Sequence, residues 1–266
     1  RPVAPGVVVH EVRLTTGGLP GGGMLWIYLP EKPPAKPVPC VLIGRTSGTH
    51  LWGSALTDSD RPEHVYYARA GFGVVAYAVS GSAEEAKSLS DKDPVLLAAA
   101  REYRDAMAGL ADARRAFDYL AAKVPALDAR RVYAVGGDSA ATLALLFAEH
   151  EPRLAGCVAF APLVDVEKWV NTCMLPQFSP PLPGYADFVR DSSPLNHTDN
   201  LRCPLLLFQV DGANRLADAT AFAERVKRNN PDVTLVRVPT SNYDPETAES
   251  MPRVVRWLKE QASKAR

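Results

Sequence analysis

The sequence predicts an α/β fold with a mostly parallel central sheet that helices cover on both faces. Short apolar runs recur along the chain, helical patterns separate them, and the runs are rich in Val, Leu and Ile without polar alternation. Strands that are buried on both faces have this continuous apolar character. The alternation of strand and helix implies right-handed crossovers between parallel strands.

The N-terminal part predicts an antiparallel hairpin at one edge of this sheet. Two strand-like runs, residues 7–16 and 23–30, are joined by a loop from Gly17 to Gly23 whose glycines favour turns. No Gly-Lys-Ser/Thr follows these glycines and no helix begins after them. The loop is therefore interpreted as a turn and not as a phosphate-binding loop.

Six further apolar runs predict the remaining strands, at residues 39–44, 72–79, 131–136, 154–162, 204–210 and 233–239. Helical patterns are found at residues 62–70, around 107–120, and at 139–150, 216–228 and 252–262. Two polar or proline-rich excursions, residues 80–94 and 163–201, interrupt the alternation. Such excursions tend to cover the carboxyl ends of the strands, where ligands bind in open α/β sheets.

Composition restricts the domain count and the partners. A chain of 266 residues that is 47% apolar can bury one substantial core, so we expect a single domain over residues 1–266. Thirty basic and thirty acidic residues cancel, so no global field attracts nucleic acid or an anionic membrane. No apolar run approaches the roughly 18 residues that span a bilayer. The start RPVAPGVVVH also lacks the apolar core of a signal peptide.

We therefore expect a soluble protein, cytoplasmic or secreted after removal of a signal, that binds a small molecule and needs neither a cofactor nor a metal. The four cysteines show no disulfide framework. Cys40, Cys157 and Cys203 lie in or beside apolar runs, where a free buried thiol is the common state. Cys173 lies in a loop-like stretch and is a candidate reactive thiol, although no base is assigned to it.

The stretch RVYAVGGDSAATLALLFAEH, residues 131–150, has the pattern of a strand, a sharp glycine-rich turn and an Ala/Leu-rich helix. A nucleophile elbow requires this context. With YYARAGFGVVAYAVSG, SPLNHTDNLRCPLLLF and MPRVVRWLKEQ, it makes the chain resemble α/β-hydrolases of the dienelactone hydrolase and prolyl-oligopeptidase-like group over nearly its whole length. The resemblance implies the α/β-hydrolase fold and, in serine esterases and peptidases of this group, a Ser-Asp-His triad.

The elbow admits two registers. A G-x-S-x-A pattern places Ser139 at the tip of the turn. Counting from Arg131 along the strand, as the resemblance implies, Gly136 and Gly137 precede Asp138 at the tip, and the backbone N–H of Ser139 completes an oxyanion hole. We favour the second register because strand and elbow are rigidly coupled. In the alternative, both polar side chains merely cap the following helix.

The other two triad positions of the family are substituted. By resemblance, Ala213 occupies the acid position after the seventh strand and Asn242 the histidine position after the eighth. The five histidines are His10, His50, His64, His150 and His197. Because none of them follows the eighth strand, a conventional triad cannot be assembled. The sequence thus predicts a degenerate triad of Asp138, Ala213 and Asn242.

Further residues are expected around the pocket. The loop from Thr46 to His50 follows the first central strand, where the family places oxyanion donors; a solvent-facing position for His50 is the alternative. Trp52, Trp169 and Tyr243 fall on loops, and aromatic walls suit flat or apolar ligands, although core packing also explains them. The expected substrate-binding residues are Thr46, Ser47, His50, Trp52, Trp169, Cys173, Gln209, Ala213, Asn242 and Tyr243. For His64 and His150 we expect ordinary surface positions, and for His197 a structural one.

Three functions fit this pattern. A serine hydrolase that cleaves esters or amides through Ser139 is implied by the resemblance and opposed by the missing histidine. A non-catalytic member would keep the pocket for binding. In the third, Asp138 is a carboxylate nucleophile or a general base in a desolvated pocket. We favour the general base, because Asn242 cannot activate water on a covalent ester. Substitution of every triad member in an intact framework also fits a repurposed or engineered hydrolase scaffold.

Overall fold

A computed structural model describes residues 1–14, 23–47, 49–88, 90, 92–174, 178, 180–211, 214–239 and 250–264. Within these residues, nine strands form one sheet in the order β1-β2-β3-β5-β4-β6-β7-β8-β9. The strands are β1 (Pro2–Ala4), β2 (Val7–Arg13), β3 (Met24–Pro30), β4 (Val38–Gly44), β5 (Gly73–Tyr77), β6 (Leu127–Gly137), β7 (Gly156–Phe160), β8 (Leu205–Val210) and β9 (Val233–Val238).

The sheet is parallel except at its N-terminal edge. β1, β2 and β3 pair antiparallel with one another in turn, and β3 pairs antiparallel with β5. From β5 through β4, β6, β7 and β8 to β9, every neighbouring pair is parallel. This confirms the prediction of a mostly parallel sheet with an N-terminal antiparallel hairpin. The short strand β1, which was not predicted, extends that edge.

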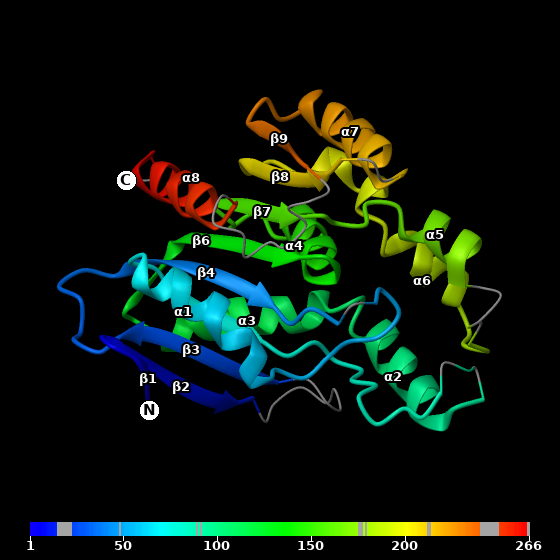
Figure 1. Ribbon diagram of the computed structural model, residues 1–266, viewed down its shortest axis with the longest axis horizontal. Helices are drawn as coiled ribbons and strands as arrows, with labels where there is room; N and C mark the ends of the chain where they lie inside the picture. The colour runs from blue at the N-terminus through cyan, green and yellow to red at the C-terminus, as the bar shows by residue number, and fades with distance from the viewer. Residues whose placement is uncertain are drawn as a thin grey trace.

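Helices cover both faces of the sheet, as predicted (Figure 1). They are α1 (Arg61–Arg69), α2 (Pro94–Asp105), α3 (Leu110–Lys123), α4 (Ser139–His150), α5 (Val166–Trp169), α6 (Tyr185–Asp191), α7 (Asn214–Lys227) and α8 (Ser250–Lys264). One face of the sheet packs against α3, α4 and α7 through residues such as Phe117, Leu145 and Phe222. The other face packs against α1 and α8 through Tyr67 and Leu258.

The helix α2 was not predicted from the sequence. Its start is fixed by Asp93, whose carboxylate accepts hydrogen bonds from the backbone N–H groups of Val95 (2.9 Å) and Leu96 (3.3 Å). Such a capping carboxylate satisfies N–H groups that have no partner within the helix. The sequence analysis placed Asp93 at the end of the excursion over residues 80–94 and assigned no element to the residues that follow it up to 106.

The two excursions and α2 contribute to a hydrophobic cluster separate from the two faces of the sheet. Its buried residues include Leu51, Leu96, Leu163, Val170 and Phe178. Figure 1 shows α5 and α6 beyond the arrowheads of the central strands, at their carboxyl ends. In the following, the term cap refers to residues 163–201, which contain α5, α6 and the π-helix Val170–Met174.

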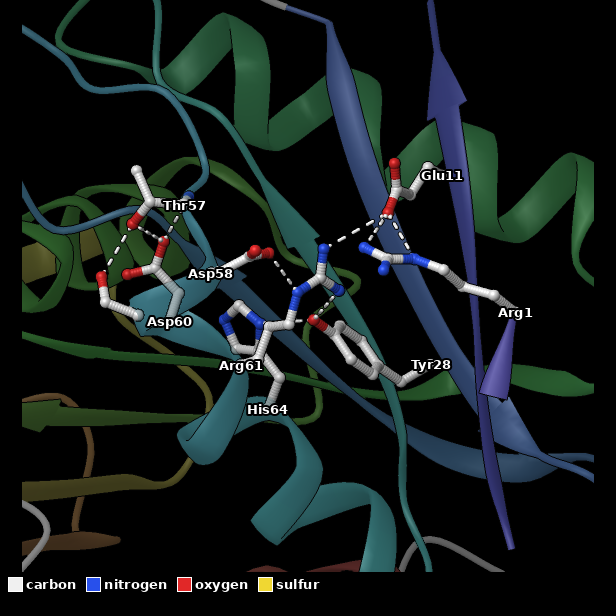
Figure 2. Close-up of polar contacts among 9 residues, drawn as sticks. Arg1, Glu11, Tyr28, Thr57, Asp58, Asp60, Arg61 and His64 are labelled. Atoms are coloured by element: carbon white, nitrogen blue, oxygen red, sulfur yellow. Dashed lines mark hydrogen bonds and ion pairs between the residues drawn. The ribbon is translucent and has the colours of Figure 1, made fainter. Parts of the chain in front are cut away.

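A polar cluster joins the N-terminal hairpin to the start of α1 (Figure 2). Arg61 forms ion pairs with Asp58 (2.6 Å) and Glu11 (3.3 Å), and its guanidinium carbon lies 3.8 Å from the centroid of the Trp26 ring. The stacked, charge-paired arginine links β2, β3 and α1. Behind it, His64 lies 3.2 Å from the hydroxyl of Tyr28 through Nδ1.

The expected surface position of His64 is wrong, because only 2% of this residue is exposed. Burial, with additional repulsion from Arg61 and Arg45, lowers the pKa of His64 to about 3. The imidazole is therefore neutral at physiological pH and packs edge-on against Trp26 and Tyr28. Its position early in a helix did not reveal that this side of α1 packs against the sheet.

A buried carboxyl group lies near the end of α4. Within the described part of the chain, neither side-chain oxygen of Glu149 has a hydrogen-bond partner, and 5% of the residue is exposed. Desolvation raises the pKa of Glu149 well above its usual value. By contrast, Glu151 is paired with Arg153, whose Nε and Nη2 donate to its carboxylate at 2.7 and 2.6 Å, and these bonds lower its pKa.

We predict that Glu149→Gln flattens the pH dependence of stability. Because folding raises the pKa of Glu149, the native state is most stable below the ordinary pKa of about 4.3 and loses stability as the pH rises toward the folded-state pKa. At pH 8 the free energy of unfolding of Glu149→Gln should exceed that of the parent by about 1 kcal/mol or more. Urea unfolding at pH 5 and pH 8 measures the difference.

Glu151→Gln is the matched control with the opposite sign. Folding lowers the pKa of Glu151 in the parent. The stability that this carboxylate contributes is therefore present above the ordinary glutamate pKa and is lost as the pH falls through the folded-state pKa. This variant should be less stable than the parent at pH 8. If Glu149→Gln were instead less stable than the parent at pH 8, the account of an unpaired buried carboxyl would be wrong.

Candidate active site

The turn from β6 into α4 has Asp138 at its tip. Asp138 has φ 50° and ψ −117°, while Ser139 is the first residue of α4. A non-glycine residue at such a backbone conformation costs about 1–3 kcal/mol and persists only where the surroundings fix it. Here the backbone N–H of Asp138 donates to the carbonyl of Phe160 on β7, at 2.9 Å. The geometry of the turn therefore corresponds to the register counted from the strand.

Close packing requires a glycine at position 136, two residues before the tip. A Cβ atom added to Gly136 would lie 2.4 Å from the carbonyl carbon and oxygen of Ala140, which is closer than real Cβ contacts. At Gly137 an added Cβ would meet no described atom within 4 Å. Gly136 and Ala140 thus lie two residues before and after Asp138, and the first turn of α4 packs directly on the end of β6.

The Asp138 carboxylate is paired with a cation. Nη1 of Arg215, near the start of α7, lies 3.4 Å from Oδ1 of Asp138, and the two side chains are 34% and 29% exposed. The carboxylate makes no capping hydrogen bond to α4, so capping is not its role. Nor is it isolated in an apolar environment, as the base-catalysis hypothesis assumed, since it is partly solvated and neutralised by Arg215.

Arg215 was not selected from the sequence. It follows the expected acid position by two residues in the segment after β8, and no catalytic pattern requires a cation there. The only signal was that this segment returns to the carboxyl edge of the sheet. The pairing itself depends on where α7 begins relative to the elbow, which the sequence does not specify.

The hydroxyl of Ser139 is engaged with the loop after β4. Only 7% of Ser139 is exposed, and its Oγ accepts a hydrogen bond from the backbone N–H of Ser47 at 2.9 Å. It also lies 3.2 Å from Ser47 Oγ, whose single proton is donated to the carbonyl of Thr49 at 2.6 Å. Thr46 donates through Oγ1 to the carbonyl of Gly137 at 3.2 Å. The loop that was expected to supply oxyanion donors therefore lies beside the elbow, and one of its N–H groups is used by Ser139.

A cavity of about 230 Å³ lies at the elbow. Its polar lining includes Thr46, Glu63, Asp138 and Ser250, and Glu63 and Ser250 have further partners. Its apolar walls come from both neighbouring strands and from α1 and α8: Tyr67, Val135, Val158, Phe160, Ala161, Met251 and Val254. Two of the site residues expected from the sequence line this cavity within the described chain, Thr46 and Asp138.

His50 is buried beside the first turn of α4. Its exposed fraction is 4%, so the solvent-facing alternative is wrong. Nε2 lies 3.1 Å from Thr142 Oγ1, which also lies 3.1 Å from the carbonyl of Leu163. The Thr142 hydroxyl has one proton and donates it to the carbonyl of Leu163. Nε2–H of His50 therefore donates to Thr142 Oγ1, and Nδ1 of His50 keeps a lone pair without a described partner.

Burial, with additional repulsion from Arg215, lowers the pKa of His50 to about 3. The imidazole is therefore neutral near pH 7, and its ring packs edge-on against Trp169 at 5.4 Å between centroids. Trp169 joins the cap to this histidine. His50 thus belongs to the wall between elbow and cap, and it makes no described hydrogen bond to Asp138 or Ser139.

The remaining expected site residues are dispersed. Trp52 packs edge-on against Phe178 in the cap, and Cys173 is exposed on the π-helix and not in a loop. Gln209 is buried on β8, and its Oε1 has no described partner. Ala213, Asn242 and Tyr243 lie outside the described residues. Their expected convergence on the elbow stays a prediction.

No protein-family model matches the chain, and no curated protein matches it by sequence. Solved structures do resemble it. Esterase B from Lactobacillus rhamnosis superposes with a TM-score of 0.68 at 15% identity, covering 99% of this chain and 88% of the esterase. A putative dienelactone hydrolase from Klebsiella pneumoniae gives 0.64 at 16% identity over 96% and 97% of the two chains. An esterase from Pyrococcus furiosus gives 0.60 at 16% identity over 96% and 91%.

The chain has the α/β-hydrolase fold. The elbow with its strained tip residue lies where this fold is expected to hold its nucleophile. Among the described residues, no helix is long and apolar enough to cross a membrane. In the same part of the chain, no group of three or more His, Cys, Asp or Glu side chains is arranged to hold a metal ion.

We predict that Gly136→Ala and Gly137→Ala have very different effects on stability. Gly136→Ala forces a Cβ into the backbone of Ala140, so the free energy of unfolding should fall by about 1–3 kcal/mol or more. Gly137→Ala adds its Cβ to open space and should change the free energy by no more than about 0.5 kcal/mol. Urea unfolding of both variants tests the elbow geometry, and equal effects would contradict it.

Proposed function

We propose that the elbow cavity of this α/β-hydrolase-fold protein binds a small, largely apolar molecule that carries a cationic or hydrogen-bond-donating group. Asp138 is the polar group that contacts this ligand. The observation that carries the proposal is the position of Asp138, a carboxylate at the strained tip of the turn that is paired with Arg215 and lines an otherwise mostly apolar cavity. Carboxylates accept hydrogen bonds and attract cations, whereas apolar walls supply most of the binding energy.

The dimensions of the cavity limit the ligand. A volume of about 230 Å³ lies below the roughly 300–1,000 Å³ of typical ligand pockets. A single aromatic ring with a short polar substituent is therefore the appropriate size. Such a ring packs against Tyr67, Phe160 and Met251, while its substituent reaches Asp138.

The contacts of Ser139 argue against conventional serine hydrolysis. Its hydroxyl is buried and held by Ser47, and a serine without a general base to take its proton is a weak nucleophile. His50, the histidine buried beside the elbow, donates to Thr142 and not to a serine. The substitutions that the family resemblance assigns to Ala213 and Asn242 remove the remaining partners, so the triad of this chain is degenerate.

A second candidate function gives Asp138 a catalytic role as a carboxylate base or nucleophile. The backbone strain at Asp138 favours it, because strained backbone conformations cluster at active sites. The ion pair with Arg215 fixes the position of the carboxylate, but Arg215 also competes with the substrate for Oδ1. Replacement of a hydrolase triad in this framework also fits a repurposed scaffold.

We predict that the chain binds small arylalkylamines through Asp138. Phenethylamine should bind, 3-phenylpropionate of similar size should not, and Asp138→Asn should weaken phenethylamine binding about tenfold or more, because a charge-assisted contact is lost. Isothermal titration at low salt measures the affinities. Ser139→Ala is the control and should retain the parent affinity, since the Ser139 hydroxyl faces Ser47. Equal affinity of the parent and Asp138→Asn would exclude the proposed contact.

We also predict that serine reactivity requires three changes together, Asp138→Ser, Ala213→Asp and Asn242→His. Triad members act as a unit, so variants with one or two of these changes should gain little. The triple variant should label stoichiometrically with a fluorophosphonate probe and hydrolyse p-nitrophenyl acetate well above the parent rate. Oxyanion donors such as the Ser139 amide contribute about 3–4 kcal/mol each in known enzymes.

Two controls interpret this experiment. The parent should label poorly, and labelling of the parent that disappears in Ser139→Ala would restore the serine hydrolase reading. A folded triple variant without labelling would show that Ala213 and Asn242 do not converge on the elbow. Retaining Asp138 with the other two changes then tests Ser139 as the nucleophile.

A further inference from the structure

A second cavity lies at the other end of α4 from the elbow. It has a volume of about 420 Å³, and its lining includes His150 at the end of α4, His197 after α6 and Met107 between α2 and α3. Because α4 spans residues 139–150, the two ends of the helix are about 16 Å apart. This cavity is therefore separate from the elbow site.

Hydrogen bonds fix the tautomers of both histidines when the rings are neutral. His150 Nδ1 lies 2.8 Å from the carbonyl of Leu146, and His197 Nε2 lies 2.9 Å from the carbonyl of Asp191. A carbonyl oxygen only accepts, so each of these ring nitrogens carries the proton and donates it. The lone pairs are left on Nε2 of His150 and Nδ1 of His197.

The two rings are close enough to share one ion. Their centroids lie 4.8 Å apart with an interplanar angle of 66°. Two imidazoles that bind the same metal through nitrogens at about 2.0–2.1 Å have centroids roughly 5 Å apart. The second ring nitrogen of metal-binding histidines usually donates to a backbone carbonyl or a carboxylate, and both rings have this arrangement.

The other polar side chains of the cavity are engaged within the protein. Arg104 donates to the Asp105 carboxylate and to the carbonyl of Pro183, Asp191 is paired with Arg190, and Ser192 donates to the carbonyl of Phe188. Within the described chain, the side-chain donors of the cavity without a described partner are therefore the two imidazole lone pairs, a thioether and Oδ2 of Asp191.

Met107 supplies the thioether. It is 51% exposed, which is unusual for a large apolar side chain in this protein, and its backbone has φ 53°. Ala108 follows with φ 56°. Two successive non-glycine residues in the left-handed region are costly, so the surroundings, including those of the buried Ala108, must hold this turn.

We propose that His150, His197 and Met107 form a binding site for a soft monovalent metal ion, Cu(I). Thioether sulfur selects soft ions, and imidazole is a good ligand for copper. In the described part of the chain no group of three or more His, Cys, Asp or Glu side chains is arranged to hold a metal ion, so the two nitrogen donors are too few for a structural zinc site. Cu(I) accepts low coordination numbers, and this donor set matches it.

The bound ion joins the cap to the core. His150 belongs to α4, which packs on the sheet, whereas His197 belongs to the cap, and Met107 lies at the start of the segment leading into α3. An ion that binds the folded chain alone stabilises it by mass action. Copper loading should accordingly raise the melting temperature in a way that depends on both histidines.

The test is an anaerobic Cu(I) titration in competition with a chromogenic chelator. The background is Cys173→Ser, because this exposed thiol is itself a soft ligand. We expect about one Cu(I) per chain, with an affinity that falls about tenfold or more in His150→Ala and in His197→Ala. Met107→Leu, which keeps the side-chain volume, should weaken binding several-fold. His10→Ala, an exposed histidine on β2, is the matched control and should leave the affinity unchanged.

A second measurement keeps the proposal testable if a histidine variant fails to fold. The chain has four methionines, so a sample labelled at the methionine methyl groups gives four resonances. The resonance of Met107 is assigned by its loss in Met107→Leu. Cu(I) should shift the Met107 resonance most. Binding that is unaffected by both histidine substitutions, binding that is absent in Cys173→Ser, or an unshifted Met107 resonance would each overturn the site.

Discussion

The close contact between Gly136 and the backbone of Ala140 is the constraint on which the candidate site depends. Since no Cβ fits between the end of β6 and the first turn of α4, the chain reverses sharply and Asp138 takes a positive φ. Hydrogen bonds to the neighbouring strand and loop, from Asp138 N to Phe160 and from Thr46 to Gly137, hold this turn at the carboxyl edge of the sheet. The side chain at the tip therefore lines the cavity because of its place in the turn.

The neighbours of the turn decide what Asp138 and Ser139 can do there. Arg215 forms an ion pair with Asp138, and the backbone N–H of Ser47 donates a hydrogen bond to the Ser139 hydroxyl. A neutral, buried His50 fixes Thr142 and Trp169 without meeting either residue. These contacts leave the Asp138 carboxylate, paired with Arg215, as part of the lining of the elbow cavity.

The helix α4 connects this site with the rest of the molecule. It is buried along its length, in agreement with an apolar sequence on all sides. One end presents the elbow, and the other presents His150 to the second cavity. Its polar residues Ser139, Thr142 and Glu149 lie near the two ends and are buried, and among the described residues the carboxyl oxygens of Glu149 have no hydrogen-bond partner.

The sequence by itself determined the order of the strands β2 to β9 and of the helices α1, α3, α4, α7 and α8, the parallel sheet with its antiparallel edge, and the elbow with Asp138 as the favoured tip. Local patterns carry this information, since apolar runs, glycines and the count from strand to turn act over a few residues. The pairing of Asp138 with Arg215, the burial of His50 and His64, and the approach of His150 to His197 were decided by the tertiary structure. These contacts join residues from distant segments, and their geometry depends on how helices and cap pack on the sheet.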